Sequence, residues 1–514
     1  MNTELLYQAI TLIDDDLIDE AGTYTPKKRK VIHWKRWIAP AACLFLAVGI
    51  GSAAYFGLFN GMGAAGNSGV NASGEGVDGS STFMSYAGPV FPLSTLEEAD
   101  GIEAARDITL DFDRTGKIYG SDITVTDAYT LTNTTAEDKV LSLLYPFVSS
   151  LMDLDQYLPS MTVNGEASET DLLFGLYAGG FQGVLGADDP EGSANLEPLT
   201  SWEGYKALLS DRTYLQAAME DYPDFTATDV IVYEFTDPWG PEETDKVPNP
   251  SIRVTFDMDY DKTIVLSYGF HAGSFDSENG KMGQGFSIPQ SFQPGYGEPY
   301  YLIVLGDDVK NMEIRGYVTG GWDPEKELDE FGVDVQRYET GLDTVLRKAV
   351  GCIYNNNSWQ YGDSLAVDFE IYYGLFCDYL TTYGILSEDC RNRYDTGWLE
   401  DLSEVGHVNR VCWLQAQVTI PAGETVSVSA VMEKEASYDF YCSGSDNRSV
   451  KGYDMVTRLG STLTFTGQQA TLLDHGQIEI VRQNFGFDLA AGIKTVDLDP
   501  AVEHYYLEIR RIEN

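Results

Sequence analysis

Closely spaced acidic residues are the first candidates for chemistry in this 514-residue chain. Asp111, Asp113 and Asp122 have the offsets of ligands in an EF-type calcium loop, with Gly116 at the sixth position. Arg114 interrupts the ligands, however, and an aspartate replaces the usual bidentate glutamate. A simple hairpin turn explains the same residues. The sequence predicts no cofactor and no metal beyond this calcium candidate.

A second acidic group consists of Asp257, Asp259 and Asp261, which alternate with Met258 and Tyr260. Alternation of this kind predicts an extended strand with the three carboxylates on one face. The group lacks the glycine that a sharp calcium-binding turn requires. We therefore expect a solvated acidic face here and no metal.

Motifs for hydrolytic catalysis are absent from the sequence. Beyond the N-terminal basic cluster, His271, His407, His475 and His504 are each isolated, and neither a His-Glu-x-x-His nor a Gly-x-Ser-x-Gly pattern occurs. No catalytic residue is predicted, and a non-enzymatic role is favoured. Carboxylate pairs for glycoside hydrolysis stay open, because only their geometry identifies them.

Aromatic residues offer a binding alternative to catalysis. Six tryptophans, together with abundant tyrosine, suit the lining of a sugar- or peptide-binding cleft, although aromatic packing in a β-sandwich explains them more simply. The six are Trp202, Trp239, Trp322, Trp359, Trp398 and Trp413.

An uncharged apolar segment, residues 37–59, follows a cluster of lysines and arginines at 27–36. A helix of this length reaches about 34 Å, enough to cross a bilayer. The basic cluster predicts a cytoplasmic N-terminus and an extracellular region after the span, anchored as a single-pass membrane protein. Cleavage near 52–54 is the alternative, in which the segment is a signal peptide.

The charge distribution agrees with export. The chain carries a net charge of −47, and residues 1–36 contain as many acidic as basic residues, so the excess lies beyond them. Such a surface repels nucleic acid and anionic lipid headgroups. Five cysteines follow the span, and their number and spacing leave the disulfide pairing open. They are Cys352, Cys377, Cys390, Cys412 and Cys442.

Composition and periodicity divide the chain into segments that position these residues. We expect a mainly β fold with helical insertions. The predicted segments are an amphipathic cytoplasmic leader (1–36), a transmembrane helix (37–59), a flexible Gly/Ser-rich linker (60–82), the first part of a β-sandwich (83–199), an inserted α+β domain (200–400) and a C-terminal β segment completing the sandwich (401–514).

Local signals add detail to this division. Ser94 to Glu97 has the form of a capping box and predicts a short helix reaching Arg106. Asn164-Gly165 predicts a hairpin. Apolar residues at helical spacing predict helices over 342–354 and 363–383. Between 230 and 317 we expect five strands, over 230–235, 251–257, 263–268, 300–305 and 312–317, separated by Gly/Pro-rich loops.

Two resemblances to known families follow from short motifs. The leader sequence over 12–21, the basic cluster and the span resemble the start of single-span surface proteins of Gram-positive anaerobes. Some of their relatives look anti-sigma-like, which implies an extracellular sensor coupled to a cytosolic regulator through 1–36. Separately, motifs at 129–133, 145–147, 163–165 and 419–424 are similar to extracellular immunoglobulin-like sandwiches with a helical insertion. That resemblance implies one discontinuous sandwich, and neither supplies catalytic residues.

The function expected from the sequence is that of a membrane-anchored extracellular sensor or binding protein for an unidentified ligand. It contacts the lipid bilayer through 37–59 and a cytosolic regulator through 1–36, and it does not bind nucleic acid. An adhesive or envelope-structural protein is the first alternative, and an extracellular hydrolase is the second.

Overall fold

The computed structural model describes residues 87–512, with gaps at 116–121, 180–205, 207–212, 291–298, 362–364, 366, 383, 388–393, 395–397, 407–408 and 440–448. The predicted leader, transmembrane helix and linker lie outside the described residues. Within the described ranges, no helix has the length and apolar character needed to span a bilayer. The fold is mainly β with few helices, as the sequence predicts.

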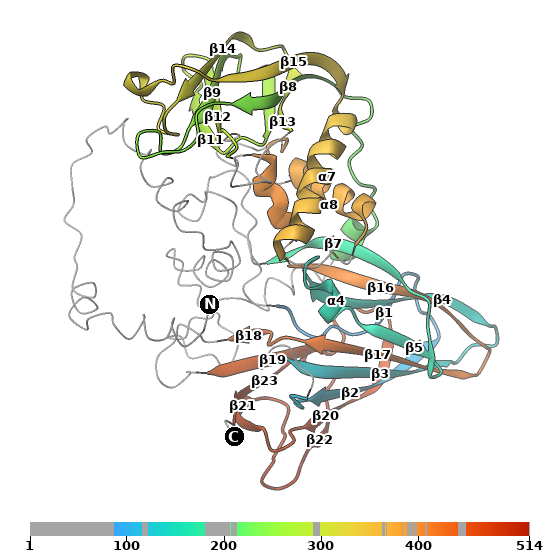
Figure 1. The fold of residues 1–514 in the computed structure, drawn as a ribbon. Helices are drawn as coiled ribbons and strands as arrows, with labels where there is room; N and C mark the ends of the chain where they lie inside the picture. Colours follow the sequence, from blue (N-terminus) through green and yellow to red (C-terminus); the bar gives the residue numbers. More distant parts are fainter. Residues whose placement is uncertain are drawn as a thin grey trace. The chain divides into compact units, whose positions relative to one another are not determined.

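Strands from both ends of the described chain pair with one another (Figure 1). β4 pairs with β16 along eleven residues, and β3 pairs with β17 along ten. One sheet has the order β1(Ser94–Thr95), β4(Lys139–Ser149), β16(Asn409–Ile420), β7(Asp171–Gly179). A larger sheet has the order β22(Thr495–Asp497), β20(Thr464–Leu473), β2(Ile102–Asp111), β3(Ile123–Asn133), β17(Thr425–Lys434), β5(Ser160–Val163), β6(Glu166–Ala167).

A third sheet comes entirely from the C-terminal part. Its order is β18(Tyr438–Asp439), β19(Val450–Val456), β23(His504–Arg511), β21(Ile478–Gln483). In β3 and β17 buried and more exposed residues alternate strictly, which is the pattern of strands with one face on a core. Leu131 and Val428 are among the side chains that fill this core.

A fully buried ion pair crosses this core. Arg106 of β2 donates from Nε and Nη2 to the two carboxylate oxygens of Asp127 in β3, each at 2.8 Å. Its Nη1 donates to the carbonyl of Val456 at 2.7 Å, and the Tyr129 hydroxyl donates to Asp127. Because every group is hydrogen-bonded, the pair can be buried without leaving a charge uncompensated. It fixes the positions of β2, β3 and β19.

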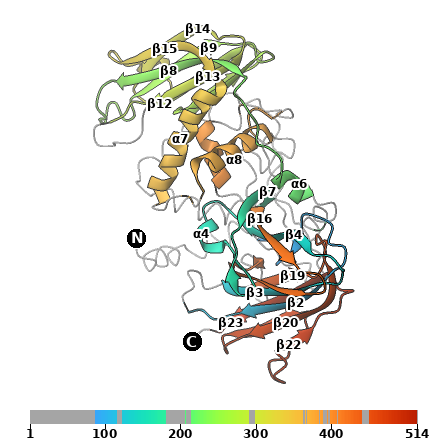
Figure 2. The same ribbon diagram turned by 90° about the vertical axis from the view of Figure 1, so that its right-hand side faces the viewer.

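The residues between β7 and β16 include two further four-stranded sheets (Figure 2). Their facing side chains form an aromatic core in which Phe270 makes edge contacts with Phe235 and Phe286. The orders are β10(Thr263–Tyr268), β13(Tyr300–Gly306), β8(Asp229–Trp239), β15(Gly332–Gly341), and β11(Ala272–Asp276), β12(Lys281–Ser287), β9(Ser251–Asp257), β14(Lys310–Tyr317).

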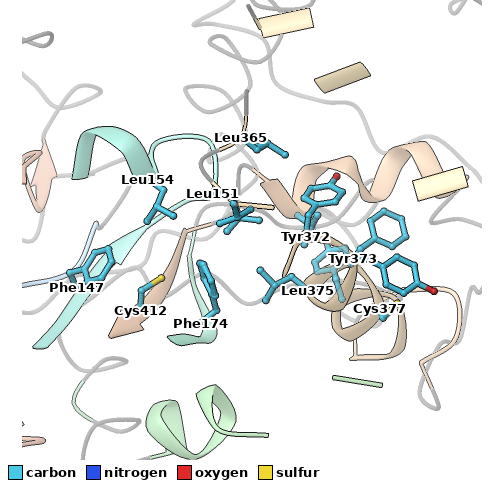
Figure 3. Packing of buried hydrophobic residues seen from close by; sticks show 14 of the residues in the cluster. Phe147, Leu151, Leu154, Phe174, Leu365, Tyr372, Tyr373, Leu375, Cys377 and Cys412 are labelled. Carbon is cyan, nitrogen blue, oxygen red and sulfur yellow. The ribbon is translucent and has the colours of Figure 1, made fainter. Parts of the chain in front are cut away.

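Helices follow these strands in the chain. α7(Leu342–Tyr361) and α8(Phe369–Thr382) match the two predicted helices, and α4(Leu154–Tyr157), α6(Thr213–Ala218), η2(Pro324–Lys326) and η3(Leu399–Gly406) are shorter. In Figure 3, Leu375 of α8 and Phe174 of β7 belong to one buried cluster, with Leu151 between the helix and the strands. The inserted residues and the paired terminal strands therefore share an apolar core.

Two local predictions are wrong, and one is confirmed. Ser94 lies in a strand, because Glu97 accepts hydrogen bonds from the backbone and hydroxyl of Ser142 across the sheet instead of capping a helix. Only Asp257 of the second acidic group lies on a strand, since Asp259 begins a turn that closes on Thr263. Asn164-Gly165 forms the predicted hairpin, with φ values of 53° and 81°.

Candidate functional site

The candidate site lies on the face of β9 and β12 that points away from the aromatic core. Along β9, Ile252, Val254 and Phe256 are buried, so Ser251 and Arg253 point to the opposite face. Directly paired residues of antiparallel strands share a face. Gly285 of β12 pairs with Arg253, and Gly283 pairs with Thr255, so both glycines lie on the same face as the arginine.

Arg253 is packed closely against this glycine floor. A Cβ atom at Gly283 would lie 3.0 Å from its Nη2 and 3.1 Å from its Nε. Its Nη2 donates to the Ser274 hydroxyl at 3.1 Å. On the other side, the Trp322 ring centroid is 4.2 Å from the guanidinium carbon, a cation–π distance. We call Arg253, Ser274, Gly283, Gly285 and Trp322 the arginine face.

The position of the Trp322 ring depends on Gly285. A Cβ atom at Gly285 would lie 2.6 Å from its Cζ2 and 3.1 Å from its Nε1, so the indole occupies the space that a side chain would take. Any residue larger than glycine at 285 would therefore displace the ring. The close packing of Arg253 and Trp322 on β12 therefore requires glycine at both 283 and 285.

The charge environment of Arg253 is unusual for this chain. Acidic residues outnumber basic ones by 80 to 33, yet among the described residues Arg253 forms no ion pair. Its cross-strand neighbour Arg315, in contrast, is bound by Glu313 and Glu327. Burial lowers the pKa of Arg253, and the nearby Tyr317 hydroxyl opposes that shift. The guanidinium still carries its charge at neutral pH.

Three buried polar atoms at this position make no hydrogen bond within the described part of the chain. They are Nε of Arg253, Nε1 of Trp322 and Oγ of Ser251. Leaving a buried donor unpaired costs about 1–3 kcal/mol. Groups of unpaired buried polar atoms are rare in folded proteins. Ligand binding or a local movement would supply the missing hydrogen bonds.

Trp322 itself has strained backbone geometry. Its φ of 50° is in the left-handed region, which bulky side chains rarely adopt. The residues around it form a small loop, 319–325, whose ends are clasped by a hydrogen bond from Val318 N–H to the Lys326 carbonyl at 2.9 Å. Gly320 and Gly321 precede the tryptophan. The loop thus holds the Trp322 ring over the guanidinium, and the backbone of Trp322 is strained.

A neighbouring histidine–serine contact does not form a hydrolase site. The backbone N–H of Ser287 donates to Nε2 of His271 at 3.1 Å, and the Ser287 hydroxyl lies 3.2 Å from the same nitrogen. Because the amide occupies the nitrogen's lone pair, the ring is not free to take a proton from the hydroxyl.

A pair of carboxyl groups forms a second feature near the β10–β11 turn. Glu400 in η3 accepts a hydrogen bond from Gly269 N–H through Oε1, whereas its buried Oε2 has no partner among the described residues. Burial raises the pKa of Glu400 to about 8 and that of Asp401 to about 6. Asp401 accepts from Trp398 N–H at 3.0 Å, as in a capping box. The pair therefore has a structural role.

The predicted calcium ligands are engaged with other groups. Asp111 contacts Nε2 of His475 at 2.7 Å, and Asp122 accepts a hydrogen bond from Gln156 at 2.7 Å. Asp113 accepts from the backbone and side chain of Thr115. Nowhere in the described ranges do three or more His, Cys, Asp or Glu residues form a group that could hold a metal ion. Residues 116–121 of the predicted loop lie outside the description, so the calcium site stays a prediction.

Arg511 adds a reason to doubt a cation at this hairpin. It donates to the carbonyl of Phe112 at 2.7 Å and to that of Asp122 at 3.0 Å. A guanidinium thus links the two ends of the predicted loop, where a calcium ion would meet electrostatic repulsion.

The tryptophans do not gather in one cleft. Trp413 is buried in β16, whereas Trp239 is 56 % exposed at the end of β8. Trp398 donates to Gln284 at 2.8 Å on the inner side of β12. Trp322 alone among the described tryptophans stacks on an arginine. Trp202 and the Trp359 side chain lie outside the described residues.

The described cysteines are free thiols. Cys377 and Cys412 are buried, Cys352 is partly buried, and burial raises the pKa of both Cys377 and Cys412 to about 12. Cys390 and Cys442 lie outside the described residues.

No protein-family model and no curated protein matches the sequence.

Proposed function

We propose that this protein is an extracellular binding protein or sensor, anchored in the membrane by residues 37–59, and that its ligand binds at the arginine face. The observation that carries the proposal is the guanidinium of Arg253, which has no ion pair among the described residues of an acid-rich chain. A cation held on a glycine floor beside unpaired donors is suited to recognising a ligand.

A non-enzymatic role is supported by the residues around the arginine. The neighbouring His271 has its acceptor nitrogen occupied, and the Glu400–Asp401 pair is explained by its bonds to Gly269 and Trp398. Neither arrangement provides a nucleophile with an adjacent base.

The proposed architecture is a discontinuous immunoglobulin-like sandwich that carries an inserted α+β domain. Support comes from the pairing of β3 with β17 and of β4 with β16, which joins residues before and after the insertion. The arginine face would then belong to the inserted domain.

Binding can be tested on the full-length protein in detergent micelles. We expect at least one compound in a panel of small anions and neutral sugars to raise the thermal midpoint of the wild type and of Arg315→Gln, which alters the neighbouring arginine that is already ion-paired. Arg253→Gln should abolish that rise. Stabilisation that persists in Arg253→Gln would place the binding site elsewhere.

Topology can be tested on intact cells. With an epitope tag at each end, added protease should remove the C-terminal tag and leave the N-terminal tag intact, as the basic cluster at 27–36 predicts. Release of the whole exported region into the medium, beginning near residue 55, would instead show cleavage of the anchor.

A further inference from the structure

We infer that the arginine face recognises a carboxylate group and that the Trp322 loop, residues 319–325, is a gate that the ligand displaces. The inference rests on the proposed binding function and specifies its ligand and its motion. It follows from the charge at the site, the buried unpaired donors and the geometry of the loop.

The charge of the site suits a monoanion. Arg253 supplies one positive charge, because Arg315 across the strand is already bound by Glu313 and Glu327. Arg253 and Arg315 together balance Glu313 and Glu327, so a carboxylate adds one negative charge to this cluster and a phosphate dianion adds two. Within a chain of net charge −47 the smaller added charge is opposed less.

The donor geometry also suits a planar group. A guanidinium presents parallel N–H donors that match the two oxygens of a carboxylate. Nε of Arg253 is unpaired, and Ser251 on the same strand face has an unpaired hydroxyl. Arg253 itself fills the space over Gly283 and Trp322 fills the space over Gly285, so a ligand has to take the place of the ring.

The gate follows from the burial of those donors. Nε of Arg253 is buried and the Trp322 ring lies on the guanidinium, so we expect a ligand to reach Nε after the ring moves. The clasp between Val318 and Lys326 lets residues 319–325 move without disturbing β14 or β15. Opening would release the strained φ of Trp322 and expose its unpaired Nε1 to water.

A comparison of matched ligands tests whether the arginine face recognises a carboxylate. Acetate and acetamide have nearly the same shape, and inorganic phosphate supplies the other common anion. We expect acetate, at constant ionic strength and pH 7, to stabilise the full-length protein where acetamide and phosphate do not. Arg253→Lys should weaken acetate binding about tenfold or more, because lysine keeps the charge but loses the paired donors.

Movement of the Trp322 loop can be measured separately from binding. Hydrogen–deuterium exchange of amides in 319–325 should rise when acetate binds and should also rise in Gly285→Ala without ligand, because the new methyl group displaces the indole. Gly467→Ala is the matched control, since a Cβ atom there would meet nothing within 4 Å. Gly285→Ala should bind acetate more tightly than the wild type.

The outcomes separate this inference from the proposed function. Stabilisation by phosphate or a neutral compound, abolished in Arg253→Gln, would overturn the carboxylate and keep the binding site. Acetate binding with unchanged exchange in 319–325 would overturn the gate. If Gly285→Ala fails to fold, the wild-type exchange with and without acetate still decides the question.

Discussion

Replacing Glu400 with glutamine should change the pH dependence of stability in a defined direction. Glutamine keeps an oxygen for the Gly269 N–H and resembles the protonated carboxyl in shape and charge. Burial raises the pKa of Glu400 from 4.5 to about 8, so in the folded protein the carboxyl is mostly protonated at pH 7. In the unfolded chain it is ionised at that pH.

The sign and size follow from proton linkage. A group whose pKa is raised by folding stabilises the protein fully below its unfolded pKa, and the contribution declines as the pH rises towards the folded pKa. With pKa values of 4.5 and about 8, the wild type should lose about 3 kcal/mol between acid pH and pH 7 that Glu400→Gln retains. At pH 5 the two proteins should differ by about 1 kcal/mol.

Urea unfolding of the full-length protein, followed by tryptophan fluorescence, measures this difference, because Trp398 lies two residues from Glu400. Exposed Glu103→Gln is the control and should follow the wild type at every pH. A constant difference between Glu400→Gln and the wild type across pH 5–8 would refute the reasoning, since it would mean that Glu400 is ionised in the folded state.

Three further predictions concern the remaining structure. Asp127→Asn should destabilise the protein by about 3–5 kcal/mol in thermal or urea unfolding, because it leaves the buried Arg106 without a counter-charge; an effect below about 1 kcal/mol would contradict the described burial. Gly165→Ala should lower stability by about 1 kcal/mol in the same assay, because φ is +81° there, whereas Gly467→Ala should not. Cys412 should react with a thiol reagent only in denaturant, because it is buried and its pKa is about 12; rapid labelling of the native protein at Cys412, located by peptide mapping, would show otherwise.

Elements with a strong repeating pattern were predictable from the sequence. The alternation of apolar residues with threonine in 123–132 predicts β3, and the apolar spacing in 342–354 predicts the first turns of α7. Both signals arise from burial of one face, which leaves a period in the sequence. The hairpin at Asn164-Gly165 was also predictable, because few residues other than Asn and Gly adopt positive φ.

The candidate site was not predictable from the sequence, because it is built on glycines, which have no side chain that would form a recognisable motif. β12 contains Gly283 and Gly285, and glycine argues against a strand in any propensity scale. In retrospect the alternation Met282-Gly283-Gln284-Gly285-Phe286 has a period of two. Which arginine and tryptophan cover those glycines depends on pairing across β9 and on the loop after β14, and neither is encoded locally.

The false helix at Ser94 has a different cause. The capping-box pattern places a serine and a glutamate three residues apart, and both side chains are satisfied equally well by other partners. Glu97 accepts from the Ser142 N–H on β4, and the Ser94 hydroxyl accepts from the Thr462 N–H at 3.2 Å. Tertiary contacts therefore outweigh a local preference of about 1 kcal/mol.

The pairing of β4 with β16 constrains the order in which parts of this protein can fold during synthesis. When the ribosome has made β4, the strand that will lie beside it is still hundreds of residues from synthesis, and Leu414 must emerge before Tyr145 gains its neighbour. The strands over 229–341 depend on no such distant partner and can fold while the chain grows. Chains that end prematurely before 409 would leave unpaired edges exposed, which makes them targets for aggregation or proteolysis.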